Sequence, residues 1–137
     1  FRSTVPFSAR FRREYADFML IPMQKLERED YYLKNLSRLR SYSAIFAVSD
    51  FYAVEMIHFL TKQGISVPGD ISVAGFDDTP MCSLISPTLT SVKQDVAMRA
   101  EIAVQKLREL KEKKEIETTV MLPVTLIERE STGIAPN

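Results

Sequence analysis

The sequence has little of the residue types that carry most catalytic and metal chemistry. Its 137 residues include one cysteine, one histidine, four glycines and no tryptophan, and 18 Lys+Arg balance 18 Asp+Glu. A single cysteine, Cys82, excludes an intrachain disulfide framework and fits a reducing compartment. Because there is no basic surplus, the chain is not expected to bind nucleic acid by itself.

Signatures of catalysis and of membrane insertion are absent as well. There is no G-x-S-x-G elbow, P-loop or G-x-G-x-x-G, and His58 has no neighbour at metal-ligand spacing, so no enzyme activity, metal or cofactor is expected. No apolar run approaches the ~18–20 residues that span a bilayer. The start, Phe1-Arg2-Ser3, resembles no signal peptide. Since it also lacks Met, we expect a piece of a longer protein.

What is present is the composition of a folded domain, 45% hydrophobic and 26% charged. Helical periodicity predicts helices over 8–19, 29–40, 50–62 and 95–114, with a short one after 78. Extended patterns predict strands at 20–23, 43–48, 71–76, 89–92, 118–122 and 124–129, the second being buried on both faces. Alternation of the two predicts an α/β fold with a mostly parallel sheet.

Polar pairs follow three of the predicted strands: Ser49-Asp50, Asp77-Asp78 and Gln94-Asp95. Ligands of open parallel sheets bind beyond the carboxyl ends of the strands, where a carboxylate can accept hydrogen bonds from sugar hydroxyls. The alternative for Asp50, Asp78 and Asp95 is helix capping. Asp77 is the better ligand candidate, because it is nearer the strand tip.

Four segments in register resemble LacI/GalR-type transcriptional regulators. They are A-I-F-A-V-S-D at 44–50, G-I-S-V-P-G-D-I-S-V-A-G-F-D-D at 64–78, P-T-L-T-S-V-K-Q-D at 87–95 and L-I-E-R-E-S-T at 126–132. Before Ser43 the match is thin, although residues 8–13 are similar to the helix that opens one wall of the effector pocket. The resemblance implies a three-layer lobe of the periplasmic-binding-protein type I class, incomplete here.

The resemblance also implies a domain organisation. Residues 1–95 would form the second lobe without its leading strand, 96–123 a helix and strand that normally return to the first lobe, and 124–137 the closing strand and tail. The apolar stripe of helix 95–114 would then lack its usual partner. The first lobe and a helix-turn-helix module would lie upstream.

The implied protein is a cytoplasmic bacterial regulator, most simply a repressor. It would bind a small effector of the sugar or nucleobase class between two lobes and act as a homodimer. It would contact operator DNA only through the upstream module, and it would need no cofactor, metal or membrane.

Individual residues receive roles by the same resemblance. The effector contacts implied by the resemblance are Asp77, Ser49 and Asp50 at the neighbouring strand tip, and Gln94. Either Arg12 or Arg13 is a further contact, and the sequence does not decide between them. Ser49 departs from the usual Asn, so a hydroxyl replaces an amide. Dimer contacts are implied in the helix after Asp50 and in the segment after Asp78. The candidates are Met56, Phe59, Leu60, Met81, Leu84 and Ile85. The alternative is that these residues belong to the ordinary core.

Two other functions are weighed against the regulator. A sugar-binding protein of an ABC transporter would share the fold, and an apolar leader upstream would identify it. A receiver-type module or enzyme would use Asp50, Asp77 and Asp78 as an acidic metal pocket. A receiver would also need a lysine at another strand end, and Lys93 is the only candidate, a loose match.

Overall fold

The computed structural model describes residues 16–112 and 119–135. The chain divides into two compact units, residues 1–36 and 37–137, and each is described by itself. Within the described residues no helix has both the length and the apolar character needed to cross a bilayer.

The first unit contains α2 (Lys25–Lys34), which begins four residues before its predicted start. The predicted strand at 20–23 is wrong, because these residues form no ladder. Arg28 of α2 is buried, and its guanidinium donates hydrogen bonds to the carbonyls of Pro22 and Met23. Those carbonyls are thus satisfied by a side chain. Of the helix predicted over 8–19, residues 16–19 are not helical and the rest lies outside the described residues.

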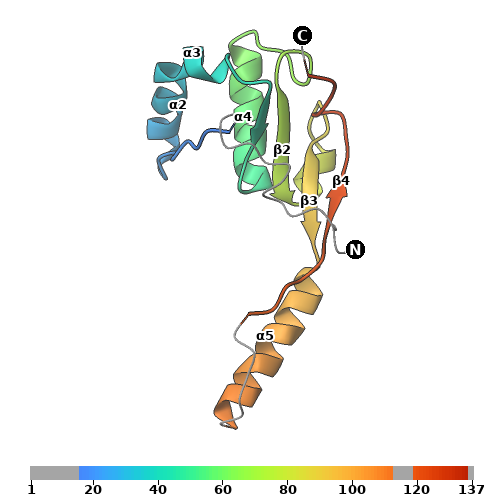
Figure 1. The fold of residues 1–137 in the computed structure, drawn as a ribbon. Helices are drawn as coiled ribbons and strands as arrows, with labels where there is room; N and C mark the ends of the chain where they lie inside the picture. Colours follow the sequence, from blue (N-terminus) through green and yellow to red (C-terminus); the bar gives the residue numbers. More distant parts are fainter. Residues whose placement is uncertain (1–15, 113–118, 136–137) are drawn as a thin grey trace. The chain divides into compact units, whose positions relative to one another are not determined.

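The second unit is built on a four-stranded sheet, which confirms the α/β class (Figure 1). The strands β1 (Ala44–Phe46), β2 (Ser72–Asp77), β3 (Thr90–Gln94) and β4 (Val124–Ile127) lie in the order β1-β2-β3-β4. The first three are parallel, with Ala44 opposite Ser72 and Ala74 opposite Thr90, and β4 is antiparallel to β3. The carboxyl ends of β1, β2 and β3 therefore meet at one edge, as the candidate site requires.

Helices connect these strands, and α4 supplies much of the core. After α3 (Leu36–Leu39) and β1, α4 (Asp50–Lys62) spans the residues predicted for it and packs against β2 (Figure 1). Gly64, at φ 71°, follows its last turn. The buried apolar residues of this unit come mainly from α4, β2 and the segments beside them: Leu39, Ala53, Met56, Ile57, Phe59, Leu60, Ile65, Ile71, Val73, Cys82 and Leu89.

Two further elements leave the strand tips. The short 3-10 helix η2 (Pro80–Ser83) follows β2, with proline at its start as predicted. The longer α5 (Val96–Lys111) follows β3, and the carboxylate of Asp95 accepts the Met98 N–H at 2.9 Å, which confirms the capping prediction there. No residue of α5 is buried, so its apolar stripe is exposed in this chain.

Strand predictions at the margins of the sheet are wrong in part. β1 was predicted to be buried on both faces, yet Phe46 is 60% exposed, so one face of β1 is not covered in this chain. The predicted strand over 118–122 is absent from its described part, 119–122. β4 ends at Ile127, two residues before its predicted end, and beyond it the hydroxyl of buried Ser131 bonds to the backbone of Val73 and Thr90.

Candidate functional site

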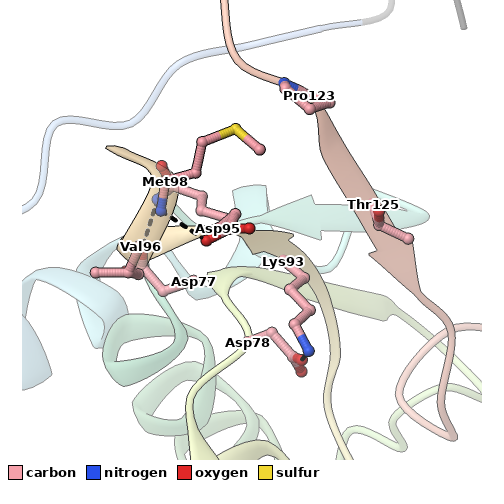
Figure 2. A pocket seen from close by; sticks show the side chains of 9 residues that line it. Asp77, Asp78, Lys93, Asp95, Val96, Met98, Pro123 and Thr125 are labelled. Atoms are coloured by element: carbon pink, nitrogen blue, oxygen red, sulfur yellow. Dashed lines mark hydrogen bonds and ion pairs between the residues drawn. The ribbon is translucent and has the colours of Figure 1, made fainter. Parts of the chain in front are cut away.

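A pocket of about 580 Å³ opens where β2 and β3 end and β4 begins (Figure 2). Two of the predicted effector residues, Asp77 and Gln94, are brought together there. Ser49 and Asp50 are not among its lining residues, and Arg12 and Arg13 lie outside the described residues. The full lining is Asp77, Asp78, Lys93, Gln94, Asp95, Val96, Met98, Pro123 and Thr125.

Asp77 is the last residue of β2 and has a left-handed backbone, with φ 107°. Its Oδ1 atom accepts a hydrogen bond from Gln94 Nε2 at 2.6 Å. The Oε1 atom of Gln94 in turn accepts one from Arg99 Nη1 at 2.9 Å, which fixes the orientation of the amide. Since no described residue donates to Asp77 Oδ2, this oxygen can accept a hydrogen bond from a hydroxyl group in the pocket.

Asp78 also has a left-handed backbone, with φ 52°, and its carboxylate is held by cations. Arg129 Nη2 donates to Oδ1 at 2.7 Å, and Lys93 Nζ lies 4.0 Å from Oδ2. The other terminal nitrogen of Arg129 donates to the Leu89 carbonyl at 2.7 Å. The capping prediction for Asp78 is wrong, because Thr79 is the residue at the N-cap of η2.

Asp50 is 1% exposed, and both of its carboxylate oxygens are hydrogen-bonded. Ser91 Oγ donates to Oδ1 at 2.6 Å, while Thr79 donates to Oδ2 from its backbone nitrogen at 2.7 Å and from its hydroxyl at 2.9 Å. The capping prediction for Asp50 is therefore wrong: Ser49 occupies the N-cap of α4, without a side-chain capping bond. We do not keep Asp50 as a direct effector contact, because both of its carboxylate oxygens already accept hydrogen bonds within the chain.

These contacts set the charge state of the buried groups. Burial alone raises the pKa of Asp50, but hydrogen bonds from Ser91, Thr79 and Cys82 outweigh it and hold that pKa below its usual value. Burial and the neighbouring Asp50 raise the pKa of the Cys82 thiol. Cys82 is thus a neutral, buried thiol, as expected of a packed residue.

The residues predicted for a dimer surface separate by burial. Met56, Phe59 and Leu60 are buried within this chain, which favours the alternative of ordinary core for them. Leu84 is 81% exposed, and its neighbours Met81 and Ile85 are intermediate. Of the six predicted dimer residues, Leu84 is therefore the one whose side chain is largely exposed.

Sequence reasoning missed four residues that organise the strand tips. Thr79 and Ser91 donate to Asp50, Arg99 orients Gln94, and Arg129 pairs with Asp78. A signal existed for Ser91, a small hydroxyl in the middle of a buried strand. Among the described residues, no group of three or more His, Cys, Asp and Glu could hold a metal ion.

The chain is similar to known proteins over most of its length. The sequence pattern of the periplasmic binding protein-like domain family matches residues 9–132. The lactose operon repressor of Escherichia coli (strain K12) is 35% identical over 95 residues, which are 69% of this chain and 26% of that protein. The ribose operon repressor of Bacillus subtilis (strain 168) is 32% identical over 120 residues, or 85% of this chain and 37% of that protein.

Solved structures give the same result. The lac repressor dimer bound to operator and the anti-inducer ONPF superposes with a TM-score of 0.66 at 31% identity, covering 75% of this chain and 36% of that one. A LacI family regulator from Bifidobacterium animalis subsp. lactis superposes at 0.74 over 86% of this chain and 44% of that one, and at 23% identity it shows the fold alone. The chain spans between 26% and 37% of the two curated relatives. The resemblance is confirmed: the chain belongs to the periplasmic-binding-protein-like family of the LacI-type transcriptional regulators.

Proposed function

We propose that the chain is the effector-sensing part of a LacI-type repressor and that the pocket at the tips of β2 and β3 binds a sugar. The observation that carries this proposal is the Asp77–Gln94 pair. One oxygen of the Asp77 carboxylate faces no described donor, beside an amide that Arg99 holds in one orientation. A carboxylate oxygen next to an oriented amide suits the adjacent hydroxyls of a sugar, which both donate and accept.

The charges around the pocket favour a neutral ligand. The acidic Asp77, Asp78 and Asp95 are balanced by Lys93 in the lining and by two arginines in contact with lining residues, Arg99 and Arg129. A strongly anionic or cationic effector would meet no matching excess of charge. A polyhydroxylated, uncharged molecule therefore fits better than a nucleotide or an amine.

The remaining parts of the function lie with the whole regulator. Effector binding would close two lobes and shift the population of a homodimer between its conformations. That shift would change its affinity for operator DNA through a separate module. The regulator would act in the cytoplasm and without catalysis. The matched relatives are named as repressors, which favours this reading over a transporter component.

A titration tests the sugar site. D-ribose and lactose, taken from the names of the two repressors above, are titrated calorimetrically into the full chain and into its Asp77→Ala and Asp70→Asn variants. We expect Asp77→Ala to weaken binding by about tenfold or more, which is ~1.4 kcal/mol, while unfolding stays cooperative. Asp70→Asn removes an exposed carboxylate outside the pocket and should leave binding unchanged. Undiminished affinity in Asp77→Ala would remove Asp77 from the site.

A sedimentation experiment tests the dimer surface. Leu84 is 81% exposed and lies in the segment after η2, so Leu84→Asp should shift the full-length regulator toward monomers. Ile134 is 96% exposed but lies elsewhere in the chain, and Ile134→Asp is the matched control. Unchanged association of Leu84→Asp would contradict the assignment.

A further inference from the structure

The Asp77 carboxylate is displayed by an unusual stretch of backbone. Asp77 and Asp78 are consecutive, neither is glycine, and both have positive φ, at 107° and 52°. Such conformations are sparsely populated in L-residues, and they persist only where the surroundings determine them. Something in the structure must therefore hold this turn, and with it the direction of the Asp77 side chain.

Four hydrogen bonds connect the residues that follow Asp77 to one buried carboxylate, two of them through Ser91. Thr79 donates both its backbone N–H and its hydroxyl to Oδ2 of Asp50. The Asp78 N–H donates to Ser91 Oγ at 3.1 Å, and that hydroxyl donates onward to Oδ1 of Asp50 at 2.6 Å. Asp50 thus receives, directly or through Ser91, two successive backbone donors of the turn.

Asp50 is itself fixed in place on the other side of Asp77. It begins α4 and is 1% exposed, and its Oδ1 and Cα atoms lie so close to Gly75 that a Cβ there would be 2.5 and 3.2 Å away. Gly75 precedes Asp77 by two residues and Thr79 follows it by two. The Asp50 side chain therefore contacts the chain on both sides of the residue that faces the pocket.

We propose that Asp50 is a positioning residue, which acts on the effector pocket through the Asp77–Asp78 turn and makes no contact with the effector. Its carboxylate accepts the turn's hydrogen bonds, keeps the backbone left-handed and so aims Asp77 at Gln94. The consequence for sugar binding rests on the function proposed above, whereas the effect on the turn does not.

The first test follows the turn itself in the full chain by NMR. Asp50→Asn removes the charge and one acceptor with little change of shape. We expect faster amide exchange at Asp78 and Thr79 and altered backbone couplings at Asp77 and Asp78. The Ser66 amide, bonded to exposed Asp70 at 2.7 Å, should be unaffected. Asp70→Asn should give the reverse pattern.

Two additional variants separate positioning from general stability. Ile57→Val removes one buried methyl from α4 without touching the turn, so it should lower stability and leave the couplings at Asp77 and Asp78 unchanged. Ser91→Ala removes the two hydrogen bonds that join the Asp78 N–H to Asp50 and keeps those of Thr79, and it decides the question if Asp50→Asn fails to fold. Unaltered couplings and amide exchange in the folded variants would overturn the proposal.

The second test separates this proposal from the sugar site. D-ribose and lactose are titrated into the wild type, Asp50→Asn and Ser91→Ala. Weaker binding by about tenfold in the variants, with Ile57→Val unchanged, supports positioning. If the wild type binds neither sugar, the sugar proposal loses its support, while the couplings and the amide exchange still decide the role of Asp50. Full affinity in a variant whose turn has relaxed contradicts the link to the pocket.

Discussion

A Cβ atom on Gly75 would lie 2.5 Å from Oδ1 of Asp50, a separation that side-chain carbons do not adopt. Gly75 is in the middle of β2 and Asp50 is the first residue of α4, so the glycine permits a close approach of the helix start to the strand. The same close approach lets the Asp50 carboxylate reach Ser91 on β3.

The Gly75 contact gives a direct prediction for stability. Gly75→Ala must displace the Asp50 carboxylate or the side chain of Leu89, whose Cδ2 would be 3.1 Å away. We expect a loss of about 1–3 kcal/mol in the free energy of unfolding, measured by urea denaturation, as for other overpacked sites. Gly133→Ala is the control, since its new Cβ would meet Pro68 at an ordinary 3.4 Å. Equal stability of the two variants would argue against the close approach.

Acid should reveal the charge of Asp50. Its folded pKa lies below the value of an unfolded aspartate, about 3.9. As the pH falls, the unfolded chain therefore takes up the proton first. The stabilisation is fully present above about pH 4 and is lost as the pH falls through the lowered folded pKa. Asp50→Asn should lose about 1.5–3 kcal/mol at pH 7 and should then show a shallower fall in stability in acid.

Glu130 provides the comparison for this experiment. Hydrogen bonds from Thr88 also hold the pKa of Glu130 below its usual value, but its side chain is exposed to solvent. Glu130→Gln should therefore keep most of the wild-type dependence of stability on pH. Urea midpoints measured from pH 3 to 7 distinguish the two variants. An unchanged acid slope in Asp50→Asn would show that the buried carboxylate does not carry the linkage.

The sequence predicts those parts of the fold that depend on local pattern. α4 spans its predicted residues because apolar periodicity and Gly64 define it, and Asp95 caps α5 because capping needs only the next turn of chain. The positions of Asp77 and Gln94 at adjacent strand ends also follow from strand order alone.

The sequence does not predict the contacts between distant segments. From the sequence alone, Asp50 is predicted to be a helix cap. Only the folded arrangement of β2 and β3 shows that its carboxylate oxygens accept hydrogen bonds from Thr79 and Ser91. The exposure of Phe46 depends on what packs against its face of β1, and the apolar run itself carries no such information. Arg129 meets Asp78 across 51 residues of sequence, beyond the range of any local pattern.

That pairing gives the last prediction, in which arginine and lysine differ. Arg129 joins Asp78 and the Leu89 carbonyl through two separate nitrogens, each at 2.7 Å, and a single ammonium cannot reproduce both contacts. Arg129→Lys should therefore leave a partly buried acceptor unpaired and cost about 1–3 kcal/mol in urea denaturation. Lys93 is 60% exposed and 4.0 Å from the same carboxylate, so Lys93→Ala should cost no more than about 1 kcal/mol. If the two variants lose equal stability, the paired contacts of the two Arg129 nitrogens are not what keeps the Asp78 carboxylate in place. A double-mutant cycle with Asp78→Asn then measures the coupling, which should be larger for Arg129 than for Lys93.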